Sequence, residues 1–137
     1  MPKQTRRSFL RNTAAIGIGA SFFLGGTKAS GKIIGANDRI RIAVAGINGR
    51  GQAHIRGFGE IDGVEIAALV DPDSRLFDER SERVRAKSGN TPKCYQDIRE
   101  LLDDPTIDAV SVATPNHWHS LMTIWACQAG KHVYVEK

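Results

Sequence analysis

The chain has 137 residues, of which 41% are hydrophobic and 25% are charged. This composition is typical of a globular protein, and the length allows one domain at most. A collagen, a coiled-coil rod and a mainly disordered chain are excluded, and two cysteines are too few for a disulfide scaffold. The formal net charge of +4 would suggest a nucleic-acid partner if it were spread over the whole chain.

The positive charge is instead confined to the N-terminal segment. Residues 1–29 hold five basic residues and no acidic one, whereas the residues from Ser30 onward are close to neutral. The charged start is followed by an apolar run over residues 14–24 and then by two glycines. This order is typical of an export signal, and the run is shorter than the roughly 20 apolar residues of a membrane-spanning helix. The sequence therefore indicates no nucleic-acid partner.

The string Thr5-Arg-Arg-Ser-Phe-Leu-Arg11 resembles the twin-arginine motif, whose usual form ends in lysine. The resemblance implies that the protein is exported to the periplasm already folded, with the twin-arginine translocase as a partner. We expect a signal peptide over residues 1–29, cleaved near Ala29, a linker over residues 30–38 and one domain over residues 39–137. An ordinary secretory signal and an uncleaved anchor are the alternatives.

Short β-rich runs alternate with amphipathic stretches through residues 39–137. This alternation predicts an α/β fold, a doubly wound parallel sheet with right-handed crossovers, in which the first and fourth strands lie side by side. The expected strands are residues 39–45, 64–70, 93–95, 107–113 and 132–136, and the expected helices are residues 52–58, 72–87, 97–102 and 117–129.

A glycine-rich turn, residues 46–51, lies between the first strand and the first helix. Gly46 and Gly51 fit the first and third glycines of a dinucleotide-binding turn, which allow the sharp bend and the close packing of helix on strand. Asn48 stands in place of the second glycine and is followed by Gly49; asparagine tolerates left-handed backbone better than most residues. Arg50 contacts either a phosphate or only solvent. A tight turn without a ligand is the alternative.

An acidic residue follows the second strand, 20 residues after the turn. Asp71 is placed to accept hydrogen bonds from the adenosine ribose hydroxyls, and its charge would repel a 2′-phosphate, which favours NAD over NADP. Arg75 lies one turn further and would weaken that preference. The alternative is that Asp71 caps a helix that begins at Pro72, and the two roles are compatible.

Two further motifs make the pattern specific. Thr114-Pro-Asn-His-Trp-His119 follows the fourth expected strand, and Gly130-Lys-His-Val-Tyr-Val-Glu-Lys137 forms the last one. Together with the glycine turn and Val70-Asp-Pro-Asp73 they resemble the glucose–fructose oxidoreductase / inositol dehydrogenase (Gfo/Idh/MocA) family over about residues 38–137.

The resemblance implies a Rossmann-type domain of an NAD(P)-dependent oxidoreductase that acts on a CH–OH group of a sugar, cyclitol or related polyol. Such a reaction needs a hydride acceptor and a base for the hydroxyl proton. The family's motifs place a loop along the cofactor's pyrophosphate and nicotinamide ribose, a glutamate near that ribose and a catalytic lysine near the substrate. In this sequence these positions are Thr114, Pro115, Asn116 and His119 for the loop, Glu136 for the glutamate and Lys137 for the lysine.

Several of these residues have a purely structural interpretation as well. Thr114 or Asn116 would cap the following helix. Three further sets are expected to be structural: His54 packs under the cofactor loop, the helix residues Trp118, Leu121 and Trp125 belong to the core, and Cys127 is a buried thiol rather than a disulfide partner of Cys94. His117 is expected to be exposed or to pack, and no metal site is expected.

The resemblance also implies that relatives continue beyond Lys137 with a second α/β domain, which supplies most substrate contacts. We therefore expect an incomplete sheet with an exposed edge and an uncovered apolar face, a chain that is inactive alone, and a longer protein that forms homo-oligomers. A non-catalytic dinucleotide- or sugar-binding module and a truncated remnant are the alternatives. A methyltransferase that uses S-adenosylmethionine is disfavoured by the two C-terminal motifs.

Overall fold

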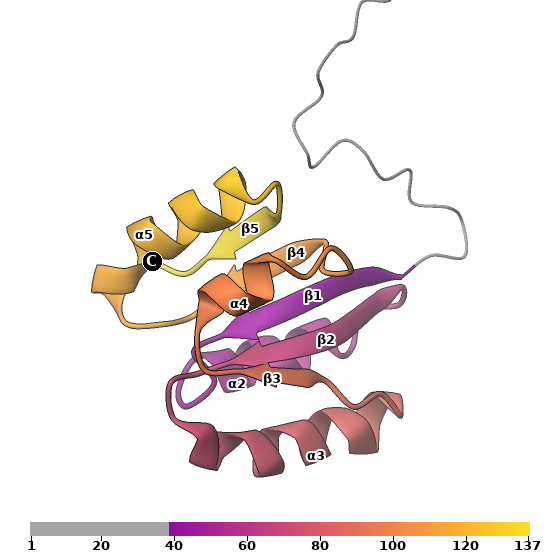
Figure 1. Ribbon diagram of the computed structural model, residues 1–137. Helices are drawn as coiled ribbons and strands as arrows, with labels where there is room; N and C mark the ends of the chain where they lie inside the picture. The colour runs from indigo at the N-terminus through magenta and orange to yellow at the C-terminus, as the bar shows by residue number, and fades with distance from the viewer. Residues whose placement is uncertain (1–38) are drawn as a thin grey trace, which may run out of the picture.

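The computed structural model describes residues 39–137. The expected signal peptide and linker lie outside these residues. Five parallel strands form one sheet in the order β3-β2-β1-β4-β5 (Figure 1). The strands are β1 (Ile40–Ala45), β2 (Val64–Val70), β3 (Lys93–Tyr95), β4 (Ala109–Val112) and β5 (His132–Val135). The helices are α2 (Gly51–Phe58), the short 3₁₀ helix η2 (Ser74–Leu76), α3 (Phe77–Ser88), α4 (Ile98–Leu102) and α5 (Asn116–Gln128).

Helices cover both faces of the sheet, as the apolar runs of its inner strands require. The first two crossovers place α2 and α3 on one face, where Val44, Ile55, Leu69 and Val84 belong to one apolar cluster. The next two crossovers place α4 and α5 on the other face (Figure 1). The second cluster is there, and it includes residues of β1, β2, β4, α4 and α5: Ala45, Val70, Val112, Leu101 and Ala126.

The predicted α/β fold is confirmed, and so is the adjacency of the first and fourth strands. β1 pairs with β4 in parallel, with Val44 opposite Ser111 and Ala45 opposite Val112. The strand order reverses between these two strands, because β2 and β3 extend the sheet from one side of β1 while β4 and β5 extend it from the other. Ligands of doubly wound sheets bind outside the carboxyl ends of the strands at such a reversal.

The predicted helix start at Asp71 and Pro72 is wrong. The chain is not helical before Ser74, and the side chain of Asp73 accepts a hydrogen bond from the Arg75 N–H and so caps η2. The Asp71 carboxylate is unable to cap this helix because it is engaged elsewhere. The predicted end of α3 is confirmed: Gly89 adopts φ +71° and donates its N–H to the Arg85 carbonyl, a common helix ending.

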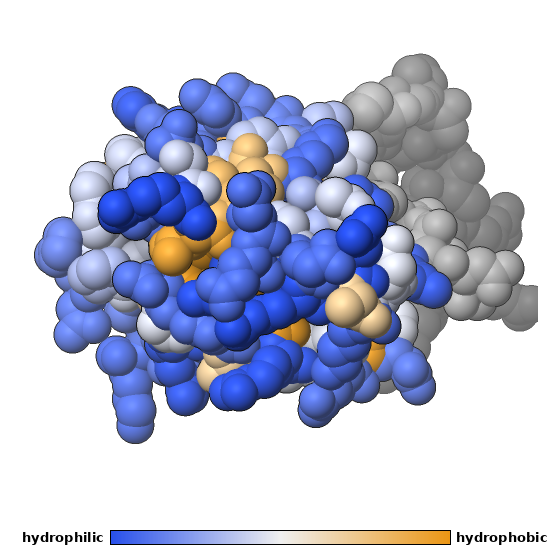
Figure 2. All heavy atoms as spheres, turned by 90° about the horizontal axis from the view of Figure 1, so that it is seen from below, coloured by the Kyte–Doolittle hydropathy of each residue, from blue (hydrophilic) through white to orange (hydrophobic). Residues whose placement is uncertain are grey.

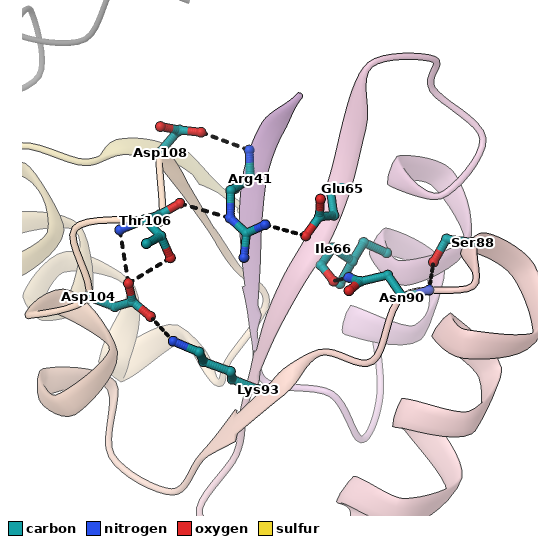
Figure 3. Close-up of polar contacts among 9 residues, drawn as sticks. All are labelled: Arg41, Glu65, Ile66, Ser88, Asn90, Lys93, Asp104, Thr106 and Asp108. Carbon is teal, nitrogen blue, oxygen red and sulfur yellow. Dashed lines mark hydrogen bonds and ion pairs between the residues drawn. The ribbon is translucent and has the colours of Figure 1, made fainter. Parts of the chain in front are cut away.

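Charged side chains connect the amino ends of the strands, opposite the candidate site (Figure 3). The Asp104 carboxylate accepts hydrogen bonds from Lys93 Nζ at 2.7 Å and from the Thr106 hydroxyl and N–H at 2.7 and 2.9 Å. Arg41 of β1 donates to the Thr106 carbonyl and forms an ion pair with Glu65 of β2. This network connects the loop before β4 to the central strand β1 and to the edge strand β3.

The surface is polar over α3 and apolar over α5. Figure 2 shows the face on the α3 side, where hydrophilic residues dominate. Exposed apolar side chains gather instead on α5 and at the β5 edge: Trp118, Leu121, Ile124, Tyr134 and Val135. Within residues 39–137 no helix has the length and apolar character needed to cross a bilayer.

Two expectations about residues of α5 are wrong: that Trp118 and Leu121 belong to the core, and that Cys127 is buried. Trp118 and Leu121 are 40% and 39% exposed, because α5 presents Met122, Trp125 and Ala126 to the sheet and turns these two side chains outward. Cys127 is also exposed, and neither it nor Cys94 forms a disulfide.

Candidate dinucleotide site

The glycine turn packs against the segment that follows β4. Gly46 has φ +83°, and a Cβ at this position would lie 2.7 Å from the Thr114 nitrogen and 2.8 Å from the Ala113 carbonyl carbon. Gly51 packs under the turn, since a Cβ there would lie 1.9 Å from the Gly46 carbonyl oxygen. Only glycine fits at either position. The turn and the Thr114 segment therefore form two adjoining walls at the carboxyl ends of β1 and β4.

The outer part of the turn leaves room for a ligand. A Cβ at Gly49 would meet nothing within 4 Å, and Asn48 is exposed. Asn48 does not use the left-handed backbone that its position suggested, because no non-glycine residue between 39 and 137 has a positive φ. α2 begins without a side-chain cap and with no acidic residue in its first turn. The Gln52 and Ala53 N–H groups at its start donate to the Gly49 and Arg50 carbonyls at 3.1 and 2.9 Å, so an anion beside the turn would be attracted mainly by the positive end of the helix dipole.

The Asp71 side chain holds the glycine turn in place. It is 8% exposed, and its two carboxylate oxygens accept hydrogen bonds of 3.0 Å from the Ile47 and Asp73 N–H groups. The Ile47 carbonyl in turn accepts a hydrogen bond from Nε of the buried Arg80. Both the N–H and the carbonyl of Ile47 are therefore held in place. Each Asp71 oxygen keeps a lone pair for a ribose hydroxyl.

These elements enclose a cleft of about 690 Å³, within the usual range of small-molecule sites. Six of the predicted binding residues line it: Gly46, Asn48, Gly49, Asp71, Thr114 and Pro115. Four further lining residues were not predicted from the sequence: Gln96, Asp97, Ile98 and Arg99. The signal that would have found them is their position directly after β3, because parallel strands end at the same edge of the sheet.

The other predicted site residues do not line this cleft: Arg50, Gly51, Asn116, His119, Glu136 and Lys137. Neither Thr114 nor Asn116 caps α5, which begins at Asn116 after Pro115 without a side-chain hydrogen bond. His119 holds the Thr114 segment through a 2.7 Å hydrogen bond between Nε2 and the Thr114 carbonyl. Lys137, the predicted catalytic residue, is exposed beyond β5.

Glu136 joins the end of β5 to the glycine turn. Its Oε1 atom accepts a hydrogen bond of 3.0 Å from Arg50 Nε and lies 2.8 Å from His54 Nε2. The other ring nitrogen of the buried His54 lies 2.7 Å from the Ser111 hydroxyl of β4. The hydrogen bonds from His54 and Arg50 lower the pKa of Glu136. His54 therefore has the structural role expected of it, and Arg50 is engaged by a carboxylate rather than facing only solvent.

A doubly wound sheet with a tight glycine turn, an acid at the end of the second strand and a cleft at the strand-order reversal is the architecture of a dinucleotide-binding domain. The chain belongs to the oxidoreductase family with an NAD-binding Rossmann fold (Gfo/Idh/MocA), whose family model matches residues 40–137. NAD is thus the cofactor of this domain, and the glycine contacts, the room at Gly49 and the acceptor capacity of Asp71 fit it.

Known proteins of this kind include both hydrolases and dehydrogenases. A glycosyl hydrolase family 109 protein from Shewanella pealeana is 34% identical over 115 residues, which are 81% of this chain and 25% of that protein. The structure of myo-inositol 2-dehydrogenase from Lactobacillus plantarum is 30% identical with a TM-score of 0.62, covering 73% of this chain and 28% of that one. The scyllo-inositol dehydrogenase of Lactobacillus casei, solved with NAD(H) and scyllo-inositol, shares the fold with a TM-score of 0.66 at 23% identity, covering 73% of this chain and 28% of that one. The chain spans about a quarter of the length of the curated relatives that it matches.

Proposed function

We propose that the chain is the NAD-binding part of an exported oxidoreductase that acts on a sugar, cyclitol or related polyol. The observation that carries the proposal is the cleft itself, in which the Gly46 turn, Asp71 and the Thr114 segment meet at the strand-order reversal. The similarity to an inositol dehydrogenase supports the substrate class.

The roles of the chain's own residues follow from their positions. Asp71 would accept hydrogen bonds from the adenosine ribose hydroxyls, and the glycine turn at the positive end of the α2 dipole would bind the diphosphate. Thr114, Pro115 and Asn116 would lie along the pyrophosphate, with His119 holding their loop in place. When bound, NAD supplies the acceptor for the hydride of a carbinol carbon.

Glu136 and Lys137 would meet the reacting end of the cofactor. Glu136 is held by Arg50 and His54, so its carboxylate is fixed and ionised near the expected nicotinamide ribose. Lys137 follows directly and would position the substrate hydroxyl. Because most substrate contacts are expected from a second domain, the proposal assigns cofactor binding, and not turnover, to residues 39–137.

Cofactor binding is measurable through the chain's two tryptophans, Trp118 and Trp125, which both line the cleft. NADH should quench their fluorescence in a saturable way by energy transfer. Asp71→Asn should raise the Kd at least about tenfold, because the amide loses a charged acceptor for the ribose. Asp62→Asn removes an exposed acid in the turn before β2 and is the matched control. Absence of saturable quenching in the wild type would refute the proposal.

The proposed export rests on the N-terminal string and the acid-free first 29 residues. Fusion of residues 1–38 to a folded reporter should deliver it to the periplasm, with the twin-arginine translocase as the partner. Replacing Arg6 and Arg7 with lysine should abolish delivery, whereas replacing Lys3 with arginine should not. Delivery in a host without that translocase would assign the signal to the ordinary secretory route.

A second candidate function is glycoside hydrolysis with NAD as a bound cofactor. The relative from Shewanella pealeana named as a glycosyl hydrolase favours it. The two functions are distinguished by the products that the protein containing this domain would release. A dehydrogenase accumulates NADH, detected at 340 nm, with a polyol substrate, whereas a hydrolase releases 4-nitrophenol from a nitrophenyl glycoside without net NADH.

A further inference from the structure

Asp73 and Arg75 form a closed ion pair next to the cleft. Arg75 Nε donates to Asp73 Oδ1 at 2.8 Å and Nη2 donates to Oδ2 at 2.7 Å, while the Arg75 N–H donates to the same Oδ1 at 3.1 Å. The guanidinium thus has two of its donors on one carboxylate, in the bidentate geometry that makes arginine pairs specific. The Arg75 side chain is 88% exposed and the Asp73 side chain 34% exposed.

This ion pair is attached to the proposed ribose-binding carboxylate. The Asp73 N–H donates to Asp71 Oδ1 at 3.0 Å, so Asp73 follows Asp71 in a tight, hydrogen-bonded arrangement. NAD and NADP differ only at the 2′ position of this ribose, where NADP carries a phosphate. An arginine close to the acid at the end of β2 is the usual means of accommodating that phosphate. Arg75 has this position in the sequence, but its guanidinium group is already paired with the Asp73 carboxylate.

A second pair of the same form lies on the other side of the cleft. Asp97 caps α4 by accepting from the Arg99 N–H, and it accepts from the Arg99 guanidinium as well. Asp97 and Arg99 line the cleft, and Gln96 reaches across to the Pro72 carbonyl at 3.0 Å. This pair follows β3, the edge strand next to β2, and in the proposed binding mode it would lie beside the adenine ring, which NAD and NADP have in common.

We propose that Asp73 is a specificity-determining residue, which excludes NADP by holding Arg75 and by keeping the 2′ side of the cleft acidic. The inference rests on the proposed binding of NAD. Two carboxylates (Asp71 and Asp73) face one guanidinium group (Arg75) here, so a 2′-phosphate with nearly two negative charges meets a net negative region. The hydrogen bond from the Arg75 side chain lowers the pKa of Asp73, so the carboxylate stays ionised at neutral pH.

The test is Asp73→Asn in the full chain, with the Kd of NAD⁺ and of NADP⁺ measured by tryptophan fluorescence or calorimetry. Asparagine keeps the capping acceptor for η2, but it removes the charge and releases Arg75. The NADP⁺ to NAD⁺ affinity ratio should rise about three- to fivefold, the upper end of the scale of one exposed charge pair, with the NAD⁺ affinity unchanged within about twofold. Asp73→Ser, which also caps, should behave in the same way.

Two controls separate the released arginine from a general change of charge. In Asp73→Asn/Arg75→Gln the ratio should return toward the wild-type value. Asp97→Asn makes the same change of charge and shape at the other pair, and it should leave the ratio within about twofold because adenine is common to both cofactors.

The results also distinguish the inference from the proposed function. If the wild type binds NAD⁺ but Asp73→Asn leaves the ratio unchanged, or if Asp97→Asn raises it equally, the inference alone is overturned. If the wild type binds neither dinucleotide, both fail. Circular dichroism of each variant, together with its retained NAD⁺ affinity, shows that a changed ratio does not arise from unfolding.

Discussion

Two glycines of the turn are required for reasons of space rather than of backbone conformation alone. The predicted Cβ positions at Gly46 and Gly51 both collide with main-chain atoms, and main chain gives way far less easily than the end of a side chain. Gly49, in the same turn, has open space around its Cα and no positive φ. One turn therefore contains both required and replaceable glycines.

The first prediction compares Gly51→Ala with Gly49→Ala. The alanine methyl at position 51 would overlap the Gly46 carbonyl oxygen, so the turn must open, and we expect a loss of about 2–4 kcal/mol in the free energy of unfolding. Alanine at position 49 should change it by no more than about 1 kcal/mol. Chemical denaturation monitored by circular dichroism measures both. Equal stability of the two variants would show that the turn has another conformation in solution.

At the scale of single elements, α3 supports a turn that belongs to a different crossover. Arg80 of α3 is 6% exposed, and its Nε atom donates to the Ile47 carbonyl at 3.2 Å. Its Nη1 atom lies 2.7 Å from the Glu79 carboxylate, so the buried charge has a partner. The position of α3 on the sheet thus determines the conformation of the dinucleotide turn between β1 and α2.

The second prediction concerns Arg80→Met, which keeps much of the side-chain volume but no donor. Loss of the hydrogen bond leaves the Ile47 carbonyl unsatisfied, and we expect the unfolding free energy to fall by about 1–3 kcal/mol and NADH to bind more weakly. Arg83→Met on the same helix is the control; its side chain is 54% exposed, and its effect should stay within about 0.5 kcal/mol. A weaker NADH affinity in both variants would point to net charge rather than to the turn.

Elements were predictable from the sequence where one local pattern decides them. The apolar runs of β1 and β2, the Gly89 stop and the short β3 all match the structure within a residue or two. The start of the helix after β2 was not predictable from the sequence, because Asp71 and Asp73 are both acceptable caps. The tertiary hydrogen bond from Ile47 engages Asp71 and leaves Asp73 to cap the helix. The outward direction of Trp118 likewise depends on how α5 lies on the sheet.

The candidate site shows the same division. Gly46, Gly51 and Asp71 were predictable because their spacing along the chain matches that of a dinucleotide-binding turn and the acid after it. The contacts of Glu136 with Arg50 and His54 join segments far apart along the chain, and no spacing rule indicates them. The Asp97–Arg99 pair was missed because a short strand and a helical turn carry little periodic signal.

In the molecule as a whole, the two ends of the sheet carry different features. The carboxyl ends hold the cleft, and the amino ends hold the network around Asp104 (Figure 3). Hydrogen bonds from Lys93 and Thr106 lower the pKa of Asp104. A carboxyl whose pKa is lower in the folded state contributes stability that is complete well above the unfolded value of about 3.9 and is lost as the pH falls through the folded value.

The third prediction is that Asp104→Asn loses about 1–3 kcal/mol of unfolding free energy at pH 7, because the amide no longer accepts from Lys93 as a charged partner. The difference from the wild type should narrow as the pH falls below about 4, where the wild-type carboxyl loses its advantage. Asp103→Asn, at the neighbouring exposed position, should change little at either pH. A difference independent of pH would mean that Asp104 acts through shape alone.

The pairing of β1 with β4 has a consequence for the order of events in folding. The Gly46 turn and the Thr114 segment belong to strands that are distant in sequence and adjacent only in the finished sheet. No early, locally folded intermediate possesses both walls, so the dinucleotide has affinity only for the fully assembled domain. It therefore acts as a folding ligand: at a hundred times its Kd it adds about 2.7 kcal/mol to stability. The protein is proposed to cross the membrane already folded. Binding of the cofactor before transport would then show that folding is complete.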